Sequence, residues 1–77
     1  MTFMIDLDER ISINPEICHG KPVIKNTRIP VELILGLLED GADYKEITNM
    51  YPHLTKDDIK ACVRFARKTI ENAQCTH

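Results

Sequence analysis

The proline at position 30 divides the sequence into two parts with different hydrophobic periodicity. Before it, residues 10–14 alternate apolar and polar side chains, and residues 22–30 are rich in β-branched residues and bounded by prolines. Both patterns are typical of short strands. Asn26 interrupts the second stretch, and asparagine tolerates the positive φ that a tight turn needs. Beyond Pro30 the apolar residues recur at helical spacing, so we expect an extended arm followed by helices.

The first expected helix spans residues 31–40 and ends where Gly41 supplies the usual C-terminal stop. Its apolar side chains cover more than half of the helix circumference; they are Val31, Leu33, Ile34, Leu35, Leu37 and Leu38. An arc this wide predicts core packing on one side and contact with the sheet or a second copy on the other. Leu33 and Leu37 are therefore candidates for a core or dimer face.

Two further helices are expected after Gly41. Asp43 and Glu46 have the spacing of a capping box, which predicts a short second helix that ends before Pro52. Thr55 then caps a third helix that runs to Gln74. These elements predict a mainly α fold, in which a short N-terminal β element precedes a three-helix, homeodomain-like bundle with a helix-turn-helix.

The third helix carries a predicted apolar stripe and a predicted basic stripe. The apolar stripe consists of Ile59, Cys62, Val63, Ala66, Ile70 and Ala73. The basic stripe, roughly opposite, consists of Lys60, Arg64, Arg67 and Lys68. Such a stripe fits either phosphate contacts of a helix-turn-helix or the solvated face of an ordinary amphipathic helix. Asp57 and Asp58 would repel phosphates where base-reading residues usually lie, so we expect the four cations to contact the DNA backbone rather than the bases.

The length of 77 residues predicts a single domain over 1–77, with an extended β arm over 1–30 and a helical bundle over 31–74. At this length folding hides about 60% of the surface that the unfolded chain exposes, so the core is thin and a homodimer is expected. Charge is unevenly distributed along the chain. Residues 31–55 hold five acidic residues and one lysine, net −4, whereas residues 56–77 hold five basic and three acidic residues, net +2.

The cellular compartment is predicted from cysteine usage and from apolar runs. Three cysteines without the spacing of a disulfide framework indicate a reducing compartment. The first residues lack the basic segment of a secretory signal, and the longest uncharged apolar run, residues 33–38, is too short to span a bilayer. We therefore expect a cytoplasmic protein without a membrane partner.

Patterns for catalysis, metal binding and cofactor binding are weak. The sequence Gly20-Lys21-Pro22 lacks the upstream glycine and the hydroxyl residue of a phosphate loop. Cys18 and His19 are adjacent, whereas metal ligands on one turn need about two to four residues between them. As a nucleophile and base they lack a third group to orient His19. We therefore expect no enzyme activity, no cofactor and no metal site.

Several motifs in register resemble one known family. The run from Ile13 to Val31 is followed at matching spacing by residues 37–41, 46–47 and 51–59. Over about residues 10–70 the chain resembles the prokaryotic family called domain of unknown function 433. The resemblance implies a small homeodomain-like helical bundle with an N-terminal β element, usually dimeric. It also implies an antitoxin-like role in two-gene modules, beside a toxin related to PIN-domain ribonucleases.

The family motif indicates a candidate partner site or turn. Its matching residues could shape the turn, the dimer or a partner site, and they are Gly20, Lys21, Pro22, Thr27, Arg28 and Pro30. Lys25 and Arg28 flank the turn around Asn26, where the family commonly has glycine. Asparagine is the next most favourable residue in a left-handed conformation, so we expect the turn to be kept.

Two functional hypotheses follow. In the first, the protein is the antitoxin of a type II toxin–antitoxin module, which binds a small PIN-like nuclease toxin and, as a dimer, its own promoter DNA. In the second, it is a homodimeric protein-interaction module without nucleic-acid binding. The acidic first turn of the third helix and the wide apolar arc of the first helix favour the second hypothesis.

Overall fold

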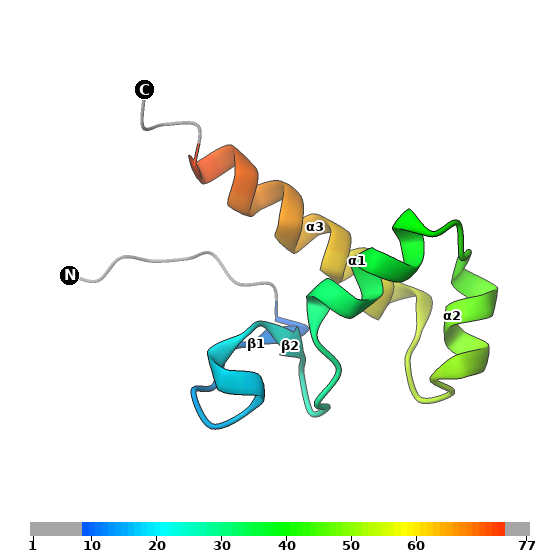
Figure 1. Cartoon of the computed structure of the whole chain (residues 1–77), viewed down its shortest axis with the longest axis horizontal. Helices are drawn as coiled ribbons and strands as arrows, with labels where there is room; N and C mark the ends of the chain where they lie inside the picture. The colour runs from blue at the N-terminus through cyan, green and yellow to red at the C-terminus, as the bar shows by residue number, and fades with distance from the viewer. Residues whose placement is uncertain (1–8, 74–77) are drawn as a thin grey trace.

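A computed structural model of the chain describes residues 9–73 (Figure 1). Its elements, in chain order, are β1 (Ile11–Ser12), a single 3₁₀ turn (Cys18–Gly20), β2 (Val23–Ile24), α1 (Val31–Glu39), α2 (Tyr44–Met50) and α3 (Lys56–Ala73). In Figure 1, α1 crosses α3 at the centre, with the strands on one side and α2 on the other. The predicted mainly α fold, with three helices and a short N-terminal β element, is confirmed. The arm before residue 9 and the predicted helix end at Gln74 lie outside the described residues.

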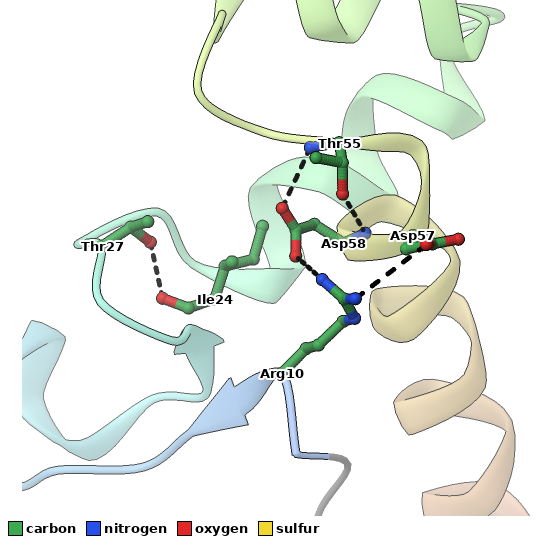
Figure 2. A network of polar contacts seen from close by, with 6 residues as sticks. All are labelled: Arg10, Ile24, Thr27, Thr55, Asp57 and Asp58. Atoms are coloured by element: carbon green, nitrogen blue, oxygen red, sulfur yellow. Dashed lines mark hydrogen bonds and ion pairs between the residues drawn. The ribbon is translucent and has the colours of Figure 1, made fainter.

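The β element is a small hairpin whose strands are shorter than predicted. β1 pairs antiparallel with β2, with Ile11 opposite Ile24. The Thr27 N–H donates to the Ile24 carbonyl at 3.0 Å, and this bond closes a turn in which Asn26 has φ +66°. The Thr27 hydroxyl also donates to the Ile24 carbonyl, at 2.6 Å (Figure 2), and accepts from the Ile29 N–H at 3.0 Å. The predicted left-handed turn at Asn26 is therefore confirmed, and Thr27 stabilises it.

The helix ends follow the capping residues in the sequence. Gly41, at φ +100°, ends α1 with hydrogen bonds from its own N–H to the Leu38 carbonyl and from the Ala42 N–H to the Leu37 carbonyl. This pair of bonds is a Schellman motif, and it needs a residue that tolerates positive φ. The predicted capping box of α2 is present, because Asp43 and Glu46 each accept the other's backbone N–H.

The core is formed by one side of each helix together with the hairpin. Its buried residues are Ile11, Val23, Ile24, Val31, Ile34, Ile47, Leu54, Ile59, Ala61 and Cys62. The expectation that Leu33 could face the core is wrong, because its side chain is 39% exposed. Leu37 is half-buried and packs against the core. The helix turns by about 100° per residue, so α1 cannot direct Leu33 and the buried Ile34 to the same side.

The predicted apolar stripe of α3 is also partly wrong. Ile59 and Cys62 are buried, but Val63 is 43% exposed and Ile70 is 63% exposed. In their place the core receives Ala61, and Phe65 packs against it. The predicted stripe and the side of α3 that is buried both contain apolar side chains at helical spacing. Which of the two sides is buried depends on the direction from which α1 packs on α3.

One ionic network joins the N-terminal arm to the start of α3 (Figure 2). The Arg10 guanidinium donates to Asp58 Oδ1 at 3.0 Å and lies 3.9 Å from Asp57 Oδ2. The Asp58 carboxylate also accepts the Thr55 N–H at 3.0 Å, while the Thr55 hydroxyl accepts the Asp58 N–H at 3.3 Å. Burial of Asp58 alone would raise the pKa of its carboxyl, but hydrogen bonds from Thr55 and Arg10 outweigh burial and lower the pKa below its ordinary value.

The lowered pKa of Asp58 predicts acid-dependent stability. We expect Asp58→Asn to lower the free energy of unfolding by about 1–2 kcal/mol at pH 7, because the carboxylate caps α3 and accepts from Arg10. The contribution is present above the ordinary carboxyl pKa and is lost as pH falls below about 4, through the lower pKa of the folded state. Urea unfolding followed by circular dichroism at pH 7 and pH 3 measures both effects. Asp57→Asn is the matched control and should cost little, because its side chain is 71% exposed; equal losses for the two variants would contradict the assignment.

Candidate partner and nucleic-acid surfaces

The outward face of α3 carries the cations that could contact nucleic acid. Lys60 and Arg67, two of the four predicted residues, are exposed there, and Arg67 pairs with Glu71 at 2.7 Å. Lys56 is exposed one turn before Lys60, with its Nζ 5.1 Å from the centroid of the Tyr44 ring. Arg64 and Lys68 are half-buried and already interact within the chain. The four predicted cations therefore fall into two groups, an exposed pair on the outward face and the half-buried pair Arg64 and Lys68. Lys56 joins the exposed pair on the outward face.

The acidic first turn of α3 is less repulsive to phosphate than the sequence indicates. Asp58 is only 14% exposed in its side chain and is paired with Arg10. Asp57 remains exposed and is 3.9 Å from the same guanidinium. The sequence shows the capping pattern of Thr55 and Asp58, but the pairing with Arg10, 48 residues away, needs the tertiary fold.

The residues of the predicted turn motif lie in different places. Gly20 has φ +83° and ends a left-handed run in which Cys18 and His19 also have positive φ. Thr27 stabilises the turn that follows β2, where Lys25 and Arg28 are exposed. Gly20 and Thr27 therefore have conformational roles, whereas the two cations are accessible at this turn.

Lys21 and Pro22 connect this motif to α1. The Lys21 ammonium donates to Glu32 Oε2 at 3.0 Å, and the Pro22 carbonyl accepts the Val31 N–H at 2.9 Å. Both residues line an apolar groove between α1 and α3. The structure thus brings Lys21 and Pro22 next to the first turn of α1, whereas Lys25 and Arg28 lie in the turn that follows β2.

A different surface, formed by α1 and α2, combines apolar hollows with carboxylates. One hollow is lined by Pro30, Glu32, Leu33, Gly36, Leu37 and Asp40. An adjoining hollow shares Leu37 and Asp40 and extends over Gly41, Ala42, Glu46, Asn49 and Met50. Leu33 and Met50 are exposed, as are the three carboxylates. We call this surface the α1–α2 face; it contains the predicted Leu33 and Leu37 and part of the acidic segment 31–55.

Gly36 is one of the residues that line the first hollow. A Cβ atom added to Gly36 would have no neighbour within 4 Å. Glycine in a helix interior is unfavourable relative to alanine, and α1 has regular helical hydrogen bonding through this position. No contact described within residues 9–73 requires glycine at this position, so its effect is to keep the surface between Leu33 and Leu37 flat.

Potential metal ligands do not cluster in the described part of the chain. Within residues 9–73 no group of three His, Cys, Asp or Glu side chains could hold a metal ion. Cys62 is buried, and Cys18 is half-buried with its Sγ 3.6 Å from the Arg28 carbonyl oxygen. Among the described helices, none is long and apolar enough to cross a membrane.

Comparisons with known proteins relate these surfaces to a family. Residues 11–66 match the model of a family described as "Protein of unknown function (DUF433)". The chain is also similar to a DUF433 member protein from Anabaena variabilis ATCC 29413, solved by crystallography, with 36% sequence identity and a TM-score of 0.75. The match covers 82% of this chain and 62% of the Anabaena chain, which is less than two thirds of that protein's length. No curated protein gives a significant match.

The open space at Gly36 predicts a stabilising substitution. We expect Gly36→Ala to raise the free energy of unfolding by about 0.5–1 kcal/mol, because alanine restricts the unfolded chain and has room in the helix. Thermal and urea unfolding of the purified protein measure the change. Gly41→Ala is the opposite control and should destabilise, because Gly41 has φ +100°. Destabilisation by Gly36→Ala would mean that another surface packs on Gly36 in solution.

Proposed function

The chain belongs to the DUF433 family of proteins of unknown function, and we propose that it is the antitoxin of a type II toxin–antitoxin module that binds a small PIN-like nuclease. In this proposal the α1–α2 face covers the nuclease, and the protein acts as a homodimer. The single observation that carries the proposal is the combination of apolar hollows and exposed carboxylates on that face.

The chemistry of an RNA-cleaving partner fits the α1–α2 face. A nuclease must attract a polyanion, so the surroundings of its active site carry positive potential. Glu32, Asp40 and Glu46 are exposed around the hollows and would complement such a surface. Leu33 and Met50 supply apolar area for affinity, whereas the carboxylates supply steering and specificity. Because Gly36 has no side chain, the backbone of a partner can approach α1 closely beside Leu33 and Leu37.

Promoter binding is the second part of the proposal, and the outward face of α3 supports it. Lys56, Lys60 and Arg67 are exposed on the longer helix of a helix-turn-helix arrangement. The pairing of Asp58 with Arg10 reduces repulsion at the start of this helix. The exposed Asp57 favours the alternative hypothesis, a homodimeric interaction module without nucleic-acid binding.

Nuclease inhibition tests the first part. The nuclease encoded beside this gene is purified, and its RNA cleavage is titrated with the protein. We expect Asp40→Lys combined with Glu46→Gln to raise the concentration needed for inhibition at least tenfold, because one carboxylate is reversed and one is removed opposite the basic partner, while glutamine keeps the capping box of α2. The matched control is Lys60→Glu combined with Arg67→Glu, which should inhibit normally. Absence of inhibition by the wild-type protein would overturn the proposal, and full inhibition by the Asp40/Glu46 variant would overturn the assignment of the face.

Salt dependence of DNA binding tests the second part. Three outward cations in each of two copies offer six phosphate contacts, so log affinity for promoter DNA should fall with log salt at a slope of about −5 at most. Fluorescence anisotropy with a labelled promoter fragment at several salt concentrations measures this slope. We expect the Lys60→Glu, Arg67→Glu variant to lose binding. A wild-type protein without measurable affinity, or with a flat salt response, would support the interaction module instead.

A further inference from the structure

The C-terminal half of α3 projects beyond the rest of the fold (Figure 1). Among the described side chains of α3, none after Cys62 is fully buried. Residues 63–72 span about 15 Å at the standard rise per residue. They pack against the core on one side, through Phe65, and their other sides are exposed or half-buried. This half of α3 therefore presents a helical surface that the single chain leaves uncovered.

An apolar groove of about 290 Å³ runs between α1 and this half of α3. Leu35 lines it from α1, and Phe65, Ala66, Thr69 and Ile70 line it from α3. The small side chains of Ala66 and Thr69 leave room for an inserted side chain. Ile70, with 63% of its surface exposed, forms an apolar ridge beside the groove.

We propose that a second copy of this chain occupies the groove, with α3 packed on α3 and Ile70 of each copy inserted in the groove of the other. A two-fold dimer uses the same patch on both subunits, so each subunit must carry both a projection and the hollow that receives it. Ile70 and the groove meet this condition because they are adjacent on one helix. The inference rests on the homodimer included in the proposed function, and it identifies the surface that forms it.

The charges around the groove permit self-association. At one end Lys21 pairs with Glu32 at 3.0 Å, and along the ridge Arg67 pairs with Glu71 at 2.7 Å. Lys21 and Glu32 line the groove itself, whereas Arg67 and Glu71 are neighbours of Ile70 along α3 outside the lining. Each pair is neutral overall, so neither opposes the approach of a second copy. Opposed like charges weaken association.

The other exposed apolar surfaces fit a second copy less well. The α1–α2 face has Asp40 and Glu46 among its lining residues, and self-packing there would bring carboxylates of both copies together. The outward side of α3 near its start carries Lys56 and Lys60, which would repel their counterparts. Charge complementarity therefore assigns the groove to self-association and the α1–α2 face to a basic partner.

The oligomeric state of matched variants tests the proposal. Sedimentation equilibrium and light scattering over a range of protein concentrations should show a dimer for the wild-type chain. We expect Ile70→Asp to raise the dimer dissociation constant at least tenfold, because the groove offers an inserted carboxylate no partner. The fold should persist in circular dichroism, since Ile70 is largely exposed in the single chain. Thr69→Arg, which fills the groove from an exposed position, should have the same effect.

Leu33→Asp is the control, because it introduces the same charge at an exposed apolar position of the α1–α2 face. It should leave the dimer intact and weaken nuclease inhibition, whereas Ile70→Asp should leave nuclease inhibition intact. The proposed interface would be overturned if the wild-type chain is a monomer. It would also be overturned if Leu33→Asp dissociates the dimer while the Ile70→Asp variant stays dimeric. Neither outcome affects the inhibition test. Loss of nuclease binding in Ile70→Asp, with a monomeric wild-type chain, would assign the groove to the nuclease and also overturn the proposal.

Discussion

The Asp58 carboxylate connects the two parts of the molecule. It completes the N-terminal cap of α3 with Thr55 and accepts a hydrogen bond from Arg10, which directly precedes β1. Because β1 pairs with β2, this contact helps to hold the hairpin against α3, where Ile11 and Ile24 enter the core. The α1–α2 face and the groove between α1 and α3 both depend on how the hairpin and the helices pack together. Lys21 and Pro22, which help to line the groove, are in turn held at the first turn of α1 by their bonds to Glu32 and Val31.

A small fold leaves much of its apolar surface accessible, and this chain distributes that surface among faces of different charge. The α1–α2 face has carboxylates around its apolar hollows, the outward side of α3 has cations, and the groove has the Lys21–Glu32 ion pair in its lining. Apolar area supplies affinity without selecting a partner, whereas charge complementarity selects one. The same physical rule thus connects the proposed nuclease, promoter and second copy to three surfaces, of which the first and the last meet at Glu32.

The sequence predicted local features well because they depend on neighbouring residues. Asn26 and Gly41 indicate positive φ, and Asp43 with Glu46 indicates a capping box; the structure confirms all three. The sequence predicted less well which sides of the helices are buried. Val63 and Ile70 were predicted to belong to the apolar stripe of the third helix; the structure exposes them and packs Phe65 against the core.

The sequence alone determined the order of elements, the limits of α1 and α2 and the start of α3 to within about two residues, and the separation of acidic and basic segments. These depend on backbone preferences and on composition, which act over a few residues. Only the tertiary structure decided which side of each helix is buried, that Arg10 pairs with Asp58, and that Lys21 and Pro22 meet α3 across a groove. Contacts between residues far apart in sequence depend on how the elements pack, and a helix with apolar residues around most of its circumference, such as α1, is compatible with several packings.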